Sequence, residues 1–385
     1  MPLFPNKITS KLPKTGTTIF TVMSALAAEH NAVNLGQGFP DFMCHPDLLR
    51  LTDAAMKKGL NQYAPMPGLL SLRERIAEKT FQLHNTEFNP ATEITITAGG
   101  TEAIYAAITS VINEGDEVII FEPAYDCYAP TIELCKGIPV YIPLQPPSYH
   151  IPWQHVREKI TPRTKMIMLN TPHNPTGSVW SRSDMLELEK IIEGTGIIIL
   201  SDEVYEHIIF DGLTHESVLK YPKLVARSFV IYSFGKTYHN TGWKMGYCLA
   251  PEILMNEFRK VHQFIVFSAN TPLQHAFAEI MNEKNLYLDL KNFYQEKRNL
   301  FLKLIEGSRF KYTPASGSYF QLLDYSAITD EKDTDIAVRL VKENGIASVP
   351  VSVFYNRQND YKQLRFCFAK QTETLERAAE RLLKV

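Results

Sequence analysis

Short apolar runs alternate with helix-length segments through the middle of the chain, from about residue 93 to residue 250. Each run has the length and the β-branched composition of a strand that is buried on both faces. Strands of this kind, separated by helices, form a mainly parallel sheet that helices cover on both sides. We expect strands at residues 93–97, 117–121, 165–169, 197–200, 229–232 and 246–250, and helices at residues 101–113 and 183–193.

Past about residue 280 the pattern changes to charged amphipathic stretches, at residues 291–306 and 372–385, with short strand candidates at residues 319–323 and 364–368. This part predicts a smaller α+β domain. A chain of 385 residues exceeds what one core usually supports. The N-terminal arm, up to Cys44, has too little apolar periodicity to fold alone, so we expect it to pack with the C-terminal part. The predicted division is a large domain at 45–282 and a second unit formed by 1–44 and 283–385.

Charge and composition disfavour several classes of function. The chain carries 40 basic and 42 acidic side chains, a net charge of −2, which gives no electrostatic reason to expect nucleic acid or an anionic membrane as a partner. The first residues lack a basic segment followed by an apolar stretch, and no apolar run approaches membrane-spanning length. We therefore expect a cytoplasmic protein with neither nucleic acid nor a membrane as a partner.

Cysteine and histidine give no indication of a metal site. The five cysteines are scattered without a Cys-x-x-Cys pair, which favours reduced thiols over a disulfide framework or a zinc site. The eleven histidines form no His-Glu-x-x-His pattern. No Gly-x-Ser-x-Gly elbow suggests a serine hydrolase. We therefore expect no bound metal.

Lys236 is the strongest candidate for chemistry in the chain. It lies in the segment SFGKT at residues 233–237, where the strand at 229–232 is expected to open into a loop. The strand at 197–200 leads directly to Asp202 and Tyr205, and ligands bind at the carboxyl ends of such strands. A lysine that can form a Schiff base, with an aspartate to pair a pyridinium nitrogen, is what pyridoxal 5′-phosphate requires of a protein.

A phosphate site is indicated where residues 98–102, AGGTE, follow a strand and open a helix. The backbone N–H groups of Gly100 and Thr101 would point at an anion at this helix N-terminus, and the Thr101 hydroxyl adds a donor. The glycine spacing matches neither a Walker loop nor a dinucleotide fingerprint. The segment therefore favours a single cofactor phosphate over a nucleotide.

Five motifs, read in order, resemble the class I and II aminotransferases, which are fold type I pyridoxal-phosphate enzymes. Within that family the chain is similar to the branch of kynurenine/glutamine transaminases and bacterial methionine aminotransferases. The resemblance covers essentially the whole chain and implies an α/β fold with a mainly parallel central sheet between helices, plus a smaller α+β domain. Its motifs are NLGQGFP at 34–40, QYAPMPG at 62–68, NTPHNPTG at 170–177, SDEVY at 201–205 and SFGKT at 233–237.

The resemblance assigns cofactor roles to these residues. Lys236 matches the Schiff-base lysine, whose amine also moves the substrate's α-proton. Asp202 matches the aspartate that keeps the pyridine nitrogen protonated. Tyr205 and Asn174 match the pair that hydrogen-bonds the phenolic oxygen, and Tyr125 matches the ring that stacks on the cofactor. The implied phosphate contacts are Gly100, Thr101, Ser233, Lys244 and, from a neighbouring subunit, Tyr63.

The same resemblance places substrate contacts and a second subunit. Arg365 matches the arginine that grips the α-carboxylate bidentately, assisted by the Gly38 N–H and by Asn174. A homodimer with shared active sites is implied by Tyr63 and by Phe267, which would line the neighbour's pocket. Phe354 is expected to shape the pocket.

The chain departs from the family pattern at two positions. Many relatives carry arginine where Lys244 stands, although lysine also occurs in this branch, and Ser268 follows Phe267 where kynurenine relatives often have histidine.

We therefore predict a dimeric, pyridoxal-phosphate-dependent aminotransferase that runs a ping-pong reaction. Its donor is a large uncharged amino acid such as methionine, glutamine, phenylalanine, tyrosine or kynurenine. No second arginine is assigned to a side-chain carboxylate, although Arg357 is unplaced, so an aspartate-specific enzyme is disfavoured. A carbon–sulfur β-lyase stays open as an alternative because the same fold supports elimination. A non-catalytic, cofactor-sensing regulator is a further alternative, but the sequence offers no DNA-binding segment.

Overall fold

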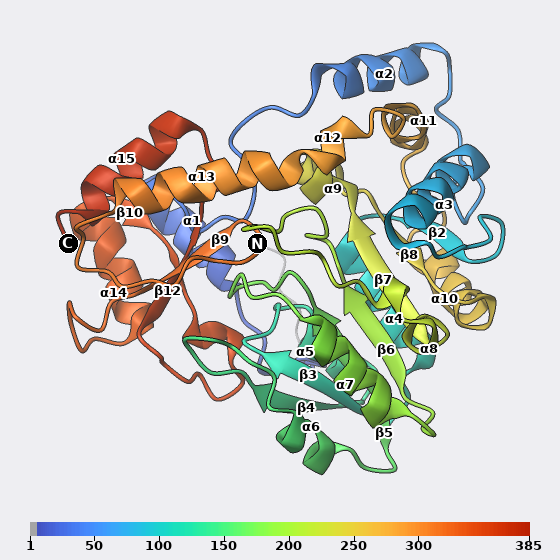
Figure 1. Cartoon of the computed structure of the whole chain (residues 1–385), viewed down its shortest axis with the longest axis horizontal. Helices are drawn as coiled ribbons and strands as arrows, with labels where there is room; N and C mark the ends of the chain where they lie inside the picture. Colours follow the sequence, from blue (N-terminus) through green and yellow to red (C-terminus); the bar gives the residue numbers. More distant parts are fainter. Residues whose placement is uncertain (1–5) are drawn as a thin grey trace.

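The structure of the chain, a computed structural model, describes residues 6–385; residues 1–5 of the predicted N-terminal arm lie outside the described part. A seven-stranded sheet crosses the larger part of the molecule in the spatial order β2-β8-β7-β6-β5-β3-β4 (Figure 1). Its strands are β2 (Ile94–Thr97), β3 (Glu117–Glu122), β4 (Ile138–Pro143), β5 (Thr164–Asn170), β6 (Ile198–Asp202), β7 (Ser228–Ser233) and β8 (Gly246–Leu249).

The pairing confirms the prediction of a mainly parallel sheet. Strands β4, β3, β5, β6 and β7 pair in parallel, whereas β8 runs antiparallel to both β7 and β2. The sequence reading missed β4, whose ends contain Pro139 and Pro143. Proline is tolerated there because β4 is an edge strand, where one side of the backbone needs no ladder hydrogen bond.

Helices cover both faces of this sheet because successive side chains of a strand point to opposite sides. On β5, Met166 and Met168 belong to the core beneath α4, α5 and α10, while Ile167 and Leu169 belong to the core beneath α2, α3, α7 and α11. The helices of this larger part are α2 (Pro46–Lys57), α3 (Leu70–His84), α4 (Gly100–Val111), α5 (Tyr128–Leu134), α6 (Trp153–Lys159), α7 (Arg182–Ile192), α8 (Pro222–Val225), α9 (Phe234–Thr237), α10 (Glu252–Ile265), α11 (Thr271–Ile280) and α12 (Asn285–Leu288).

A separate core holds the two ends of the chain together. In Figure 1 the blue helix α1 lies among the orange and red C-terminal elements, and β1 pairs in parallel with β10. A three-stranded antiparallel sheet has the order β11-β12-β9. The division into a large domain at 45–282 and a second unit formed by 1–44 and 283–385 stays a proposal. The elements are α1 (Ile19–Glu29), β1 (Val33–Asn34), α13 (Leu290–Leu304), β9 (Phe320–Asp324), α14 (Asp333–Arg339), β10 (Ile346–Ala347), β11 (Val349–Pro350), β12 (Gln363–Cys367) and α15 (Thr372–Leu382).

The carboxyl ends of the parallel strands gather polar groups at one edge of the large sheet. Asn170 ends β5, Asp202 ends β6 and Ser233 ends β7. The prediction that the strand before Lys236 opens into a loop is wrong. The lysine lies in the single-turn helix α9, whose first residue directly follows β7. In residues 6–385, no helix combines the length and the apolar character that crossing a membrane requires.

Candidate active site

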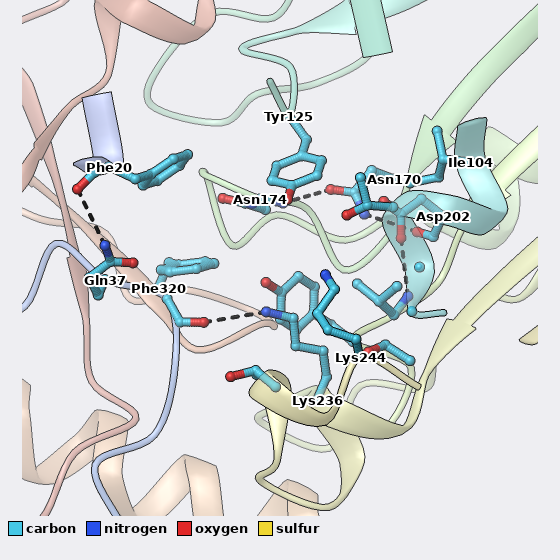
Figure 2. A pocket seen from close by; sticks show the side chains of 18 of the residues that line it. Phe20, Gln37, Ile104, Tyr125, Asn170, Asn174, Asp202, Lys236, Lys244 and Phe320 are labelled. Carbon is cyan, nitrogen blue, oxygen red and sulfur yellow. Dashed lines mark hydrogen bonds between the residues drawn. The ribbon is translucent and has the colours of Figure 1, made fainter. Parts of the chain in front are cut away.

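A cavity lies at this carboxyl edge, and it is lined by the sheet, the loop at Gly38 and strands β9 and β12. Figure 2 shows the side chains of Asp202 and Lys236 in the same close-up, with Phe320 approaching from the smaller part of the chain. Most of the residues singled out from the sequence line this one cavity: Gly38, Gly100, Thr101, Tyr125, Asn174, Asp202, Tyr205, Ser233, Lys236, Lys244 and Arg365.

Lys236 projects from α9 into the cavity. Its Nζ donates hydrogen bonds to the Tyr319 hydroxyl at 2.8 Å and to the Gly38 carbonyl at 3.3 Å. Burial lowers the pKa of the Lys236 amine to about 8, because a charged ammonium is costly away from water. Near neutral pH an appreciable fraction of the amine is therefore unprotonated and able to act as a nucleophile or a base.

Asp202 ends β6 at the floor of the cavity and is buried. Burial raises the pKa of its carboxyl to about 6, against the opposing effect of hydrogen bonds to the charged form. The Tyr128 hydroxyl donates to Oδ2 at 2.6 Å, and the Val204 N–H donates to Oδ1 at 3.3 Å. At neutral pH the carboxyl is an anion held in place, which suits it to pair with a cationic ring nitrogen.

An anion cradle lies where α4 begins. The residue before it, Gly99, has a φ of +85°, which favours glycine, and a Cβ on Gly100 would lie 3.2 Å from the Val204 side chain. The Lys244 side chain passes beside Gly99, since a Cβ atom added to Gly99 would lie 3.5 Å from the Lys244 Cε. The N-terminus of a twelve-residue helix and a lysine thus meet, which is the setting that phosphate groups occupy in proteins.

Arg365 lies in β12 at the opposite side of the cavity and is 1 % exposed. Its guanidinium stacks 4.0 Å from the centre of the Phe320 ring and donates to Asn174 Oδ1 at 2.9 Å and to the Gly36 carbonyl at 2.7 Å. Its Nε has no hydrogen-bond partner among the described residues. A buried cation with a free donor in a cavity is suited to bind a carboxylate.

Two tyrosines complete the lining. Burial raises the pKa of both the Tyr125 and the Tyr205 hydroxyl above the usual value, so both remain protonated donors at neutral pH. Tyr125 packs edge-on against Tyr128 at 5.9 Å, and Tyr205 packs edge-on against Tyr319 at 5.1 Å between ring centres. These contacts fix both phenol rings at the cavity wall.

An amine, an anion cradle, an aspartate and an arginine in one cavity are the groups that a pyridoxal-phosphate enzyme needs. The family model for aminotransferase class I and II matches residues 30–382 of this chain. The chain belongs to the class I and II aminotransferases. Members of this family depend on pyridoxal phosphate and act on amino acids and 2-oxo acids.

Named relatives agree with this assignment. The aminotransferase is 48% identical over 382 residues to the methionine aminotransferase of Escherichia coli K12, covering 99% of this chain and 98% of that protein. It is 34% identical over 428 residues to a kynurenine–oxoglutarate transaminase of Dictyostelium discoideum, covering 99% and 96%. The solved structure of the E. coli methionine aminotransferase superposes with a TM-score of 0.97 at 48% identity, with 100% of each chain covered.

Three predicted residues of the aminotransferase do not line the cavity. Tyr63 and Phe267 pack edge-on against each other at 5.3 Å, and their exposed fractions are 82% and 47%. Phe354 is buried behind Arg365, with its ring centre 5.6 Å from the guanidinium carbon. Phe354 therefore supports the position of Arg365 within this subunit and does not itself line the pocket.

Sequence reasoning missed other lining residues. Asn170 opens the NTPHNPTG motif, and its side chain donates to the Asp202 carbonyl at 2.9 Å and accepts from the Asn174 N–H at 2.8 Å, so the motif offered a signal. Gln37, Gly99 and Val204 also lie inside motifs quoted above, whereas the remaining missed residues lie in segments without a recognisable chemical pattern. The missed lining residues are Phe20, Gln37, Gly99, Ile104, Asn170, Val204, Thr241, Met245 and Phe320.

Proposed function

We propose that this aminotransferase binds pyridoxal 5′-phosphate and transfers the amino group of methionine, or of another large uncharged L-amino acid, to a 2-oxo acid. The reaction has two halves: the donor leaves as its 2-oxo acid, and a second oxo acid then accepts the amino group. The observation that carries the proposal is the cavity in which Lys236, Asp202 and Arg365 meet beside the N-terminus of α4.

The residues present fit the cofactor. Bound pyridoxal phosphate supplies an electron-accepting ring that stabilises the charge left when an α-proton departs. We assign its phosphate to the N-terminus of α4, Thr101, Ser233 and Lys244, because backbone donors and a cation gather there. Asp202 would pair with the ring nitrogen, and the phenolic oxygen would lie near Tyr205 and Asn174, with Tyr125 against the ring.

Lys236 serves as the base in this proposal. Its amine lies inside the cavity, and burial brings its pKa to about 8, so that it can accept a proton at Nζ near neutral pH and return it. Arg365 orients the substrate by its α-carboxylate, with the Gly38 N–H alongside. Both groups are fixed by the surrounding fold, which supports catalysis through orientation.

The lining of the cavity supports an uncharged donor. The cationic side chains that line it in residues 6–385 are Lys236, Lys244 and Arg365, and each already has a role in the proposal. Arg357 is exposed and does not line the cavity. Phe20 and Phe320 present apolar rings beside Arg365. The name of the E. coli relative places methionine first among the donors to test.

We also propose a homodimer in which Tyr63 and Phe267 act at the partner's site. Two large aromatic side chains in mutual contact yet exposed, at 82% and 47%, favour burial against a second copy of the chain. A cytoplasmic location stays a prediction from the sequence.

The absorption spectrum of the purified protein tests the proposal. We expect a visible-region cofactor band that bleaches when methionine is added alone and returns when an oxo acid follows. A donor panel should then rank methionine and other large uncharged amino acids above aspartate. Absence of any cofactor band after addition of pyridoxal phosphate would contradict the cofactor assignment. Strong selectivity for aspartate would contradict the substrate class, and release of pyruvate and ammonia from cystathionine without an oxo acid would identify a β-lyase instead.

A further inference from the structure

Tyr319 lies immediately before β9 and is buried among other aromatic rings. Its ring centre lies 5.1 Å from that of Tyr205, 5.7 Å from that of Tyr294 and 5.0 Å from that of Phe320. No motif in the sequence points to it. Because these rings are packed on several sides, the position of its hydroxyl is set by the core of the smaller part of the chain.

The hydroxyl makes two hydrogen bonds of defined direction. It donates its proton to the Gly38 carbonyl at 2.6 Å, so its lone pairs are left to accept from Lys236 Nζ at 2.8 Å. The amine also reaches the Gly38 carbonyl, at 3.3 Å. Lys236, Tyr319 and Gly38 therefore form a closed triangle of contacts that joins three segments distant in sequence.

We propose that Tyr319 is a positioning residue for Lys236: its hydroxyl holds the free amine at a fixed place in the cavity and couples it to the Gly38 loop. This inference rests on the proposed function, in which the free amine moves the α-proton. Lysine has four rotatable side-chain bonds, and proton transfer requires the base within hydrogen-bond reach of the proton. A fixed acceptor at 2.8 Å restricts the amine to one region.

The electrostatic consequence can be measured. The groups that act on the Lys236 amine are Cys367, Arg365, Asp202 and Lys244, and the rings of Tyr205 and Tyr319 lie beside it. An oxygen that accepts from an ammonium stabilises the charged form. Removal of the Tyr319 hydroxyl leaves only the longer contact to the Gly38 carbonyl, so the pKa of the amine should fall further below its usual value.

The test compares Tyr319→Phe with Tyr294→Phe in the full-length chain. Tyr294 belongs to the same ring cluster, but its hydroxyl contacts His239 Nδ1 at 3.0 Å and makes no hydrogen bond to Lys236. The first readout is the pH dependence of acetylation of Lys236 by dilute acetic anhydride, followed by mass spectrometry on protein freed of pyridoxal phosphate. The second is the steady-state kinetics of the loaded enzyme with methionine. Circular dichroism verifies that each variant is folded.

We expect Tyr319→Phe to shift the acetylation profile of Lys236 to lower pH and to reduce kcat about tenfold, with KM for methionine within about twofold. Tyr294→Phe should match the wild type in both readouts. An unchanged acetylation profile with an unchanged kcat in folded Tyr319→Phe would overturn the proposal, as would equal effects of the two substitutions. A wild-type protein without turnover would contradict the proposed function alone, because the acetylation profile still decides whether Tyr319 holds Lys236.

Discussion

The Tyr128 hydroxyl donates a 2.6 Å hydrogen bond to Oδ2 of Asp202, across 74 residues of sequence. Tyr128 is the first residue of α5, and Asp202 is the last residue of β6, so the bond joins a helix on one face of the sheet to the carboxyl edge. Burial pushes the pKa of Asp202 up, and this hydrogen bond pushes it down. The tyrosine therefore helps to keep the aspartate ionised inside the protein.

Tyr128→Phe should shift the acid limb of the pH profile of kcat/KM to higher pH. The loss of the hydroxyl removes a hydrogen bond to the charged form, so the pKa of Asp202 rises above about 6 and the carboxyl is protonated at a higher pH. A hydrogen bond to a charged group contributes about 1.5–3 kcal/mol, which corresponds to about 1–2 pKa units, so the ionised fraction of Asp202 and with it kcat/KM at pH 7 should fall about twofold to fifteenfold. Kinetics with methionine between pH 5 and pH 9 measure both effects.

Tyr141→Phe on β4 is the matched control, since the Tyr141 hydroxyl makes no hydrogen bond to a residue in the described part of the chain. A Tyr128→Phe profile that overlays the wild-type profile would show that Asp202 does not depend on this contact.

Arg365→Lys should raise KM for methionine about tenfold to a hundredfold. Lysine keeps the positive charge but loses the planar fork that contacts Asn174 and Gly36 and the stacking on Phe320. Steady-state kinetics with methionine supply the measurement, and Arg357→Lys, an exposed arginine outside the cavity, should leave KM unchanged. Equal KM values for both variants would count against Arg365 as the carboxylate contact.

Mixed dimers should show that Tyr63 acts in the partner's site. We expect Lys236→Ala and Tyr63→Ala homodimers each to have low activity. If Tyr63 acts across the interface, a hybrid of the two subunits contains one site with both residues intact, and about half of the wild-type activity returns on mixing. Activity is measured after subunit exchange and purification of the doubly tagged hybrid. If Tyr63 acts within its own subunit, every hybrid site carries one defect and the hybrid stays as weak as its parents.

Acid should destabilise the protein through His173. This histidine is buried in the NTPHNPTG segment, and burial lowers its pKa from 6.5 to about 4. Between these values the unfolded chain binds a proton that the folded protein excludes, so stability is fully present above pH 6.5 and is lost as the pH falls toward 4. The loss reaches about 3 kcal/mol from this group.

His173→Gln should make the dependence of Tm on pH between 6.5 and 4 shallower without abolishing it, because burial also lowers the pKa of His84 and of His239 to about 4. His30→Gln, at the exposed end of α1, should keep the wild-type slope. Equal slopes of Tm against pH for the wild type, His173→Gln and His30→Gln would show that His173 does not contribute to the loss of stability in acid. Thermal unfolding followed by circular dichroism provides the measurement.

The sequence by itself determined six of the seven strands of the large sheet and much of the site. Continuous apolar runs, in which apolar residues do not alternate with polar ones, indicated strands buried on both faces, because the side chains on either side of such a strand pack into a core. The chemistry of Lys236 and Asp202 was also readable, since each stands in a local motif at the end of a strand, whereas the role of Arg365 was implied only by the resemblance to the family. The predicted strand at residues 364–368, for example, differs from β12 (Gln363–Cys367) by one residue at each end.

Only the tertiary structure decided which side chains support those groups. Tyr128 meets Asp202, Tyr319 meets Lys236 across 83 residues, and Phe20 meets Arg365 from α1. An isolated aromatic residue in a sequence carries no sign of its partner, because its contacts depend on the spatial order of strands and on how the two ends of the chain pack together. The local pattern thus determined which residues could react, and the long-range packing of apolar cores determined where each is held and what its pKa becomes.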